Sequence, residues 1–250
     1  MRLAGLLTLL SSIGVPAGSA SAAPVSSDAL ARLDALHERR DDRAALGEAR
    51  RLAAEALGQA PADYGVLWRA ARATFDESEE RGLPEDERSR LGKQAYDLAE
   101  RAIAANPNDV AGQYWAALSI GRYAEGMGVV RALANGIEDK FKRPLERATA
   151  LDVRYDHGNI PVVWAAYYLE VPWPKRDRVK AARELERALA INPANLRARL
   201  YQARIAADEG RPAEAKALLA GIAAAPVGRY DAPEERRVKT EAASLSATIR

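Results

Sequence analysis

A short phrase, Glu-Arg-Ala-x-Ala, occurs three times in the sequence and restricts the possible folds more than any other feature. Its copies begin at Glu100, Glu146 and Glu186, and a weaker copy begins at Glu55. Repetition at a spacing of a few tens of residues is typical of stacked supersecondary units, none of which can bury its apolar face alone. The sequence therefore predicts a solenoid of similar units.

Each unit is predicted to be a pair of helices. Apolar residues within 28–57 recur with helical spacing, and the polar run 38–43 interrupts them as the turn of a helical hairpin would. Proline disfavours helical geometry in the residue before it, so Pro61, Pro107 and Pro193 mark helix ends. The sequence has no segment with the alternating β-branched residues typical of a strand. We therefore expect an all-α fold.

The last unit fits a helix–turn–helix template of about 34 residues without gaps. Small and aliphatic residues stand where tetratricopeptide repeats (TPRs) place packing residues, namely Ala203, Ala215, Leu219 and Ile222. Alanine lets two helices approach closely, so we expect Ala188 and Ala203 at close helix contacts. The resemblance implies a TPR-like right-handed solenoid of antiparallel helix pairs.

The upstream units are longer than this template. Successive copies of the phrase are 46 and 40 residues apart, and the surplus falls between the two helices of a unit, at 76–90, 121–136 and 170–178. Insertions of this kind collect on one face of a solenoid, as part of its working surface or as solvent-exposed loops. We interpret the acidic stretch within 76–87 as a solvated loop.

The first 22 residues have the pattern of a secretory signal peptide. Arg2 precedes an apolar run over 3–15, and the small residues Ala20-Ser21-Ala22 resemble a cleavage site. An uncleaved membrane anchor is the alternative, but the run is shorter than the ~20 residues that a span needs. We expect cleavage before Ala23, a periplasmic or secreted location, and no membrane insertion of the mature chain.

Composition excludes some kinds of covalent link and gives no support to a nucleic-acid partner. The chain has no cysteine, which excludes disulfides and a lipid anchor at a lipobox cysteine. A net charge of +2 on 250 residues gives no electrostatic reason to expect a nucleic-acid partner. The expected organisation is a short linker at 23–29, about five helix pairs over 30–229 and a capping helix at 230–250. The charged residues within 234–239 predict a polar face on that last helix, which seals the final unit.

Several stretches between Val66 and Ile249 carry a more specific resemblance. They are Leu67-Trp68-Arg69-Ala70-Ala71-Arg72-Ala73, Ala111-Gly112-Gln113-Tyr114-Trp115-Ala116, residues 136–152, Val171-Pro172-Trp173 and residues 234–243. Together they resemble the TPR family named regulator of microtubule dynamics. Periplasmic TPR proteins associated with TRAP-type transporters, the T-components, are similar over the same helices.

These resemblances imply the fold and a scaffold role with a protein partner. The T-component likeness implies the solute-binding protein of a transporter as one such partner. Microtubule association is not implied, because an exported protein meets no tubulin.

The sequence has no recognisable motif for catalysis, metal binding or cofactor binding. His37 and His157 stand in no metal-binding pattern, and Gly126-Met127-Gly128 lacks the third glycine and the strand of a dinucleotide site. His157 lies in a predicted turn where Asn159 is available to cap the next helix. We therefore expect no enzyme activity, no cofactor and no metal site.

Aromatic and arginine residues in the first helix of each unit are the candidate partner-binding residues. That helix lines the concave face of such a stack, and Trp and Tyr often anchor interfaces. Arg197 and Arg204 share one helix face and could hold an acidic peptide or a carboxylate. The alternatives are core packing for the aromatic residues and a solvated face for the arginines. The candidates are Tyr114, Trp115, Arg122, Trp164, Tyr167, Tyr168, Arg197, Tyr201 and Arg204.

Two functions fit these features. The first is an exported, non-enzymatic TPR scaffold that binds a protein partner through its concave face. The second is a periplasmic accessory or carrier protein that encloses a small apolar or anionic ligand. In the second, the aromatic first helices and Arg122, Arg197 or Arg204 would supply the lining. The absence of an enclosed cavity, together with the absence of a co-purified small molecule, would exclude the second function.

Overall fold

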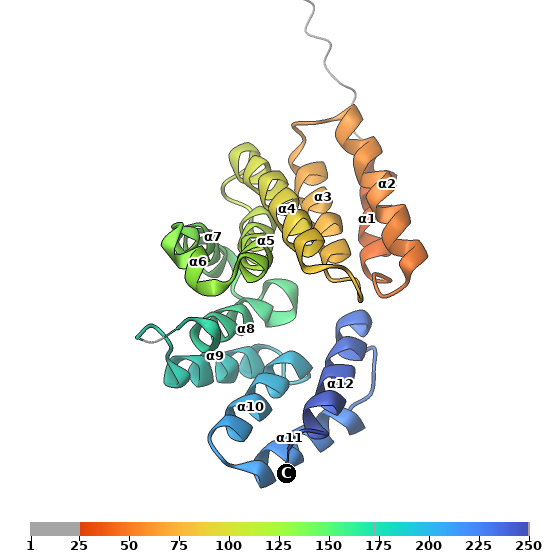
Figure 1. Ribbon diagram of the computed structural model, residues 1–250. Helices are drawn as coiled ribbons and strands as arrows, with labels where there is room; N and C mark the ends of the chain where they lie inside the picture. Colours follow the sequence, from red (N-terminus) through yellow and green to blue (C-terminus); the bar gives the residue numbers. More distant parts are fainter. Residues whose placement is uncertain (1–25, 173, 250) are drawn as a thin grey trace, which may run out of the picture.

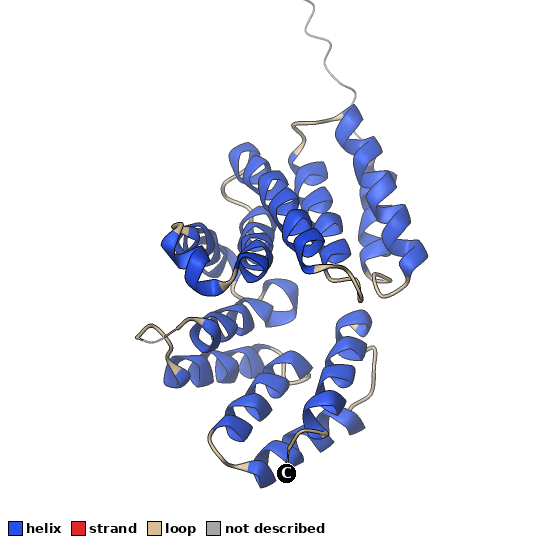
Figure 2. Ribbon diagram, in the orientation of Figure 1, coloured by secondary structure: helices blue, strands red, loops and turns tan. Residues whose placement is uncertain are grey.

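The computed structural model describes residues 26–172 and 174–249, in which the regular secondary structure is helical (Figure 2). The predicted signal peptide and Trp173 lie outside the described residues. The described helices are α1 (Ser27–His37), α2 (Arg43–Gln59), α3 (Tyr64–Ser78), α4 (Glu85–Ala105), α5 (Val110–Met127), α6 (Val129–Ala134), α7 (Ile137–Asp152), α8 (Tyr155–Glu170), α9 (Arg178–Ile191), α10 (Leu196–Asp208), α11 (Pro212–Ala224) and α12 (Ala232–Ser246).

The helices form a TPR-like solenoid, as the sequence predicts. Helix α1 packs on α2, α3 on α4, α5 on α7, α8 on α9 and α10 on α11, and α6 is a short addition between α5 and α7. The pairs follow one another along an arc (Figure 1). Helix α12 then returns from α11 toward the end of the arc that holds α1 and α3.

A repeated turn separates one helix pair from the next. The helices before Pro61, Pro107 and Pro193 each end two residues ahead of the proline, which confirms the predicted stops. Two residues beyond each proline, an aspartate or asparagine caps the following helix, and its side-chain oxygen accepts a hydrogen bond of 2.9 Å from a backbone N–H. Such caps satisfy backbone donors that a helix start leaves unpaired. The same local chemistry therefore sets the start of α3, α5 and α10.

The first alanine of the repeated phrase is buried between helices in every copy. Ala102, Ala148 and Ala188 are each 0% exposed, and so is Ala203 in the next unit. The arginine before each phrase alanine is exposed. Close packing at Ala188 and Ala203 is thus confirmed, and it explains why a small residue recurs there.

The interpretation of the acidic stretch 76–87 as a solvated loop was wrong at both ends, because Asp76 lies in α3 and residues 85–87 form the first turn of α4. Asp76 lies inside α3 with its side chain only 5% exposed, and the Glu79 side chain is 18% exposed. Both carboxylates are paired with cationic side chains of distant segments. Burial of a carboxylate is tolerated when it is paired in this way, which the local sequence cannot reveal.

Helix α12 also differs from its prediction. Val238 and Ala242 are buried against α10 and α11, so this apolar side seals the last unit as expected. The charged start of the helix, however, is not a solvent-facing surface: Glu234 is 7% exposed and Glu235 is 0% exposed. Glu235 accepts hydrogen bonds from backbone N–H groups of the loop 228–230, and Glu234 forms ion pairs described below.

Replacing Ala188 or Ala203 with leucine is expected to destabilise the fold by about 1–3 kcal/mol, because the added volume enters a closely packed helix contact. Leucine is nearly as good a helix former as alanine, so the loss would report crowding between helices. Exposed Ala213 in α11 is the matched control and should tolerate leucine within about 0.5 kcal/mol. Urea denaturation provides the measurement. Equal stability for all three variants would contradict the packing described here.

Candidate functional site

A central cavity of about 870 Å³ lies inside the arc of helices. Its lining residues come from α1, α2, α3, α5, α6, α7, α8, α10 and α12. All three predicted insertions contribute to the lining, through Glu79, Leu133 and Val171 among others. The cavity therefore assembles residues from both ends of the described chain.

One wall of the cavity is largely apolar and aromatic. Helices α5, α7 and α8 contribute Leu118, Ile137, Phe141, Val163 and Tyr167 to it. The rings of Phe141 and Tyr167 stack with their centroids 5.4 Å apart. A wall of this composition favours an apolar guest, whose removal from water supplies the free energy of binding.

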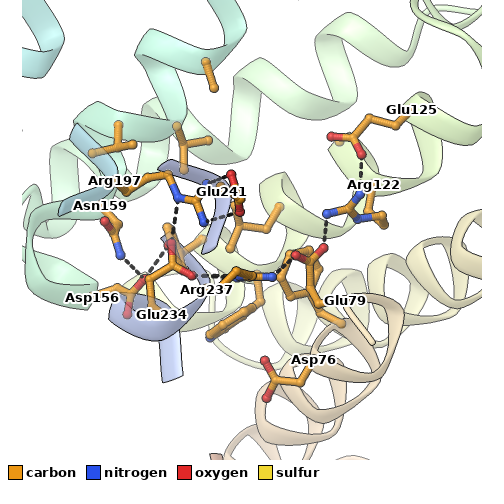
Figure 3. A pocket seen from close by; sticks show the side chains of 18 of the residues that line it. Asp76, Glu79, Arg122, Glu125, Asp156, Asn159, Arg197, Glu234, Arg237 and Glu241 are labelled. Carbon is orange, nitrogen blue, oxygen red and sulfur yellow. Dashed lines mark hydrogen bonds and ion pairs between the residues drawn. The ribbon is translucent and has the colours of Figure 1, made fainter. Parts of the chain in front are cut away.

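A second part of the lining is a continuous series of ion pairs, which we call the ion-pair ladder; Figure 3 shows it from Glu125 to Glu241. In order, its members are Glu125, Arg122, Glu79, Arg237, Glu234, Arg197, Glu241 and Arg204. Opposite charges alternate along the whole series. The ladder crosses from α5 to the end of α3, then to α12, and finishes on α10.

Arg197 holds the centre of the ladder. Its Nε donates to Glu234 at 2.7 Å, and its two terminal nitrogens donate to Glu241 at 2.6 and 3.0 Å. Burial alone would raise the pKa of Glu234, but Arg197 and Arg237 hold the pKa of this carboxyl well below its usual value. Glu234 therefore stays ionised across the physiological pH range.

Three ion pairs join α12 and its cap to the α1–α3 region, and we call this junction the seam. The pairs are Arg40–Asp231, Asp41–Arg236 and Glu79–Arg237. Their partners are 191, 195 and 158 residues apart in the sequence. A solenoid unit ordinarily contacts only its neighbours, so the seam is what converts the arc into a ring.

The side chains of His37 and Asp76 lie next to the seam on its inner side, where Asp76 contacts Arg40. His37 Nδ1 lies 2.7 Å from Asp76, and Arg40 lies between Asp76 and Asp231. Burial opposes the charged form of Asp76, yet His37 and Arg40 hold the pKa of this carboxyl below its usual value. The imidazole also packs edge-on against Trp115, with ring centroids 5.8 Å apart.

A strained bend shapes the floor of the cavity. Asp156 and His157 have positive φ angles of 51° and 57°, which are uncommon for residues other than glycine. The next residue, Gly158, also has a positive φ, and a Cβ there would lie 2.7 Å from Ile191. The bend places Asp156 so that it accepts a 2.5 Å hydrogen bond from the hydroxyl of Tyr114.

The predicted helix cap at Asn159 is not formed. The predicted turn is present, because residues 156–158 have non-helical backbone angles. The Asn159 side chain, however, bonds to other side chains and not to the backbone of the helix that follows. The Asn159 amide instead donates to Asp156 at 3.0 Å and accepts from Asn195 at 2.9 Å, which links α8 to the start of α10. Burial and the Asp156 carboxylate raise the pKa of Tyr114 well above its usual value, so its hydroxyl remains the donor.

Seven of the nine candidate residues line the cavity. They are Tyr114, Trp115, Arg122, Tyr167, Arg197, Tyr201 and Arg204. Trp164 and Tyr168 are not part of the lining and pack between helices instead. The Trp164 indole N–H donates to Thr149 of α7 at 3.0 Å, and the Tyr168 ring stacks on Trp164.

The three candidate arginines are already paired with carboxylates of the same chain. Glu79 binds Arg122, while Glu234 and Glu241 of α12 bind Arg197, and Glu241 also binds Arg204. Sequence reasoning missed these carboxylates because their partners lie 37 to 44 residues away in the chain. For Glu234 and Glu241, the dense charge along a helix predicted to cap the last unit is the one signal in the sequence.

The described residues contain neither a candidate metal site nor a helix that could span a membrane. Within 26–172 and 174–249, no group of three or more His, Asp or Glu side chains is placed to hold a metal ion. The helices described in those ranges are all too short or too polar to cross a bilayer.

Comparison with known proteins identifies the family. The profile of the regulator of microtubule dynamics protein 1-3 family matches residues 29–157, more than half of the chain. This chain belongs to that family. A tetratricopeptide repeat profile matches residues 175–232, in the last units of the solenoid. Neither profile is that of an enzyme family.

The relatives match over part of their length. Regulator of microtubule dynamics protein 1 of Bos taurus is 30% identical over 116 residues, which are 46% of this chain and 36% of that protein. The Homo sapiens protein of the same name is 27% identical over 111 residues, 44% of this chain and 34% of the relative. The match therefore spans about a third of each relative.

A solved structure supports the fold over most of the chain. The crystal structure of a TPR protein from Thermus thermophilus superimposes with a TM-score of 0.58 and covers 85% of this chain and 97% of its own. The sequence identity is 20%. The likeness is one of architecture.

Replacing Glu234 with glutamine is expected to destabilise the protein by about 1–3 kcal/mol at pH 7, because Arg197 and Arg237 each lose one of two carboxylate partners. The folded-state pKa of Glu234 is lowered, so its contribution is present above the unfolded-state pKa and fades as the pH falls below it. The stability difference between wild type and variant should therefore shrink by roughly 1.4 kcal/mol per pH unit below about pH 4.3.

Urea denaturation at pH 7 and at pH 3 measures this difference. Exposed Glu186 on α9 is the matched control, and Glu186→Gln should change stability by no more than about 0.5 kcal/mol at either pH. A Glu234→Gln difference that is equally large at both pH values would show that the ionised carboxylate is not what stabilises the ladder.

Proposed function

We propose that this protein is a non-enzymatic scaffold that takes a segment of a protein partner into its central cavity. The TPR fold is one used for protein interaction, and the inner helices of its stack line this cavity. The observation that carries the proposal is the apolar wall over α5, α7 and α8, which is open to the cavity although the rest of the core is closely packed.

The chemistry of the lining selects the kind of segment. A volume of about 870 Å³ accommodates only a few side chains. The arginines that an acidic peptide would need are neutralised by Glu79, Glu234 and Glu241. The proposed partner segment therefore presents apolar or aromatic side chains to Leu118 and Phe141, and acidic groups play no part in its anchoring.

A small apolar ligand is the second candidate occupant. The cavity volume falls within the range of roughly 300–1,000 Å³ typical of small-molecule sites. An anionic ligand has less support, for the same reason as an acidic peptide. Native mass spectrometry of the purified protein distinguishes the candidates, since a co-purified small molecule would appear as an added mass that denaturation removes.

The relatives' printed name concerns microtubule dynamics, and we do not extend that role to this chain. The matched part is about a third of the relatives' length, and a chain exported as we propose below would not meet tubulin. The matches above name no transporter component, so a solute-binding protein as partner is supported by the sequence resemblance alone.

We propose further that the chain is exported. The support is the basic, apolar and small-residue pattern of residues 1–22. Expression in a bacterial host is expected to yield a periplasmic product whose N-terminal sequence begins at Ala23. A product that keeps residues 1–22 and stays in the cytoplasm would contradict this proposal, and Arg2→Glu, which removes the positive charge, should reduce export.

Filling the cavity is expected to abolish partner binding. Ala166 of α8 is partly buried and lines the cavity, so Ala166→Trp places a large ring inside it. Exposed Ala190 on α9 is the matched control, because Ala190→Trp adds the same ring outside the cavity. Affinity capture from an extract of the source cells, with quantitative mass spectrometry, measures the result.

We expect a partner that wild type and Ala190→Trp retain equally and that Ala166→Trp loses at least about tenfold, a difference of about 1.4 kcal/mol in binding. Circular dichroism should show that both variants keep the wild-type helix content. A partner retained equally by all three proteins would place binding outside the cavity.

A further inference from the structure

The seam differs in kind from the other helix junctions of the ring. Within the solenoid, neighbouring helices share clusters of buried apolar side chains, and α12 shares such a cluster with α10 and α11. In the described part of the chain, no such cluster contains residues of both α12 and the α1–α3 region. Side-chain charge is what joins the ring at this point.

The cavity lies directly behind the seam. Arg40, Asp41 and Glu79 on one side, and Asp231 and Arg237 on the other, all belong to the cavity lining. Separation of the two sides would widen the entrance to the cavity and would part no buried apolar cluster of the described residues, because none of them spans the seam. Separation at another helix junction of the ring would break a cluster of buried apolar side chains.

We propose that the seam is an electrostatic gate, which opens by separation of α12 from the α1–α3 region and admits the guest to the central cavity. Helices α8 to α12 move as one piece, because one buried apolar cluster joins α8, α9 and α10 and another joins α10, α11 and α12. That the cavity receives a guest rests on the proposed function above, whereas the opening of the seam is a property of the protein alone.

The exposure of the seam pairs makes the gate sensitive to salt. The side chains of Asp41 and Arg236 are 38% and 50% exposed, and those of Glu79 and Arg237 are 18% and 33% exposed. Salt screens exposed charges strongly and buried charges much less. The pair Arg40–Asp231, with exposures of 14% and 7%, is the most protected of the three, so the other two pairs weaken first as the salt concentration rises.

The absence of cysteine from the sequence allows a direct test. Spin labels on Ala44→Cys in α2 and Ala243→Cys in α12, both at exposed positions, report the distance across the seam by pulsed electron paramagnetic resonance. Labels on Ala190→Cys and Ala243→Cys report a distance that does not cross it. At low salt we expect one narrow distance for each pair.

Two perturbations should open the seam. About 1 M NaCl reduces the Debye length to about 3 Å and should create a longer-distance population for the pair across the seam only. Arg236→Glu combined with Arg237→Glu, which repels Asp41 and Glu79, should do the same at low salt. The charge-matched control is Arg183→Glu with Lys216→Glu, at exposed positions of α9 and α11, and it should leave both distances unchanged.

Adding Asp41→Arg to the reversed double variant should partly restore the short distance, because it recreates an opposite-charge pair. Circular dichroism checks that each protein is folded. If the double variant unfolds, the distance across the seam of the wild type in high salt decides whether the gate exists. A short, narrow distance across the seam that persists both in high salt and in the folded double variant would overturn the gate. If the seam opens but Ala166→Trp captures the partner as well as wild type does, the gate is supported and the proposed function is refuted.

Discussion

Arginine–carboxylate pairing between the first and last helices is the interaction on which the central cavity depends. A helical solenoid grows by contacts between neighbours, and nothing in that rule brings its two ends together. Here Arg40, Arg236 and Arg237 connect α12 with the α1–α3 region and bound the space between them. Without the seam, the same helices would present an open concave groove. The fold of each unit is thus independent of the seam, while the shape of the binding space is not.

The ladder also decides the chemical character of that space. Its four arginines and four carboxylates alternate, so each charge is offset by neighbours on the same chain. A buried charge is costly unless it is paired, and these pairs satisfy that condition internally. What remains to attract a guest is the apolar surface around Leu118 and Phe141. The proposal of an apolar occupant rests on this balance between the paired charges and the apolar wall.

The family match and the repeat match lie on either side of most of helix α8. The first ends at His157, within the bend of positive φ angles, and the second begins at residue 175, just before α9. Helix α8 lies between them and contributes Asp156 to the floor of the cavity and Tyr167 to its apolar wall. Hydrogen bonds from Tyr114 and Asn159 to Asp156 hold this helix in place. The bend therefore aligns the two halves of the chain around one cavity.

The sequence by itself determined the repeating unit. Periodic apolar residues, prolines two positions before each capping residue and the recurring buried alanine act within one unit or between neighbours, so their pattern is visible in the linear chain. Seven of the nine candidate residues also reached the cavity for this reason, because the first helix of a unit faces inward. Only the tertiary structure decided the ring, the buried roles of Asp76 and Glu234, and the pairing that neutralises Arg197. Those features depend on residues that are far apart in the chain. They come together because of how successive helices pack on one another, and no local sequence pattern shows that arrangement.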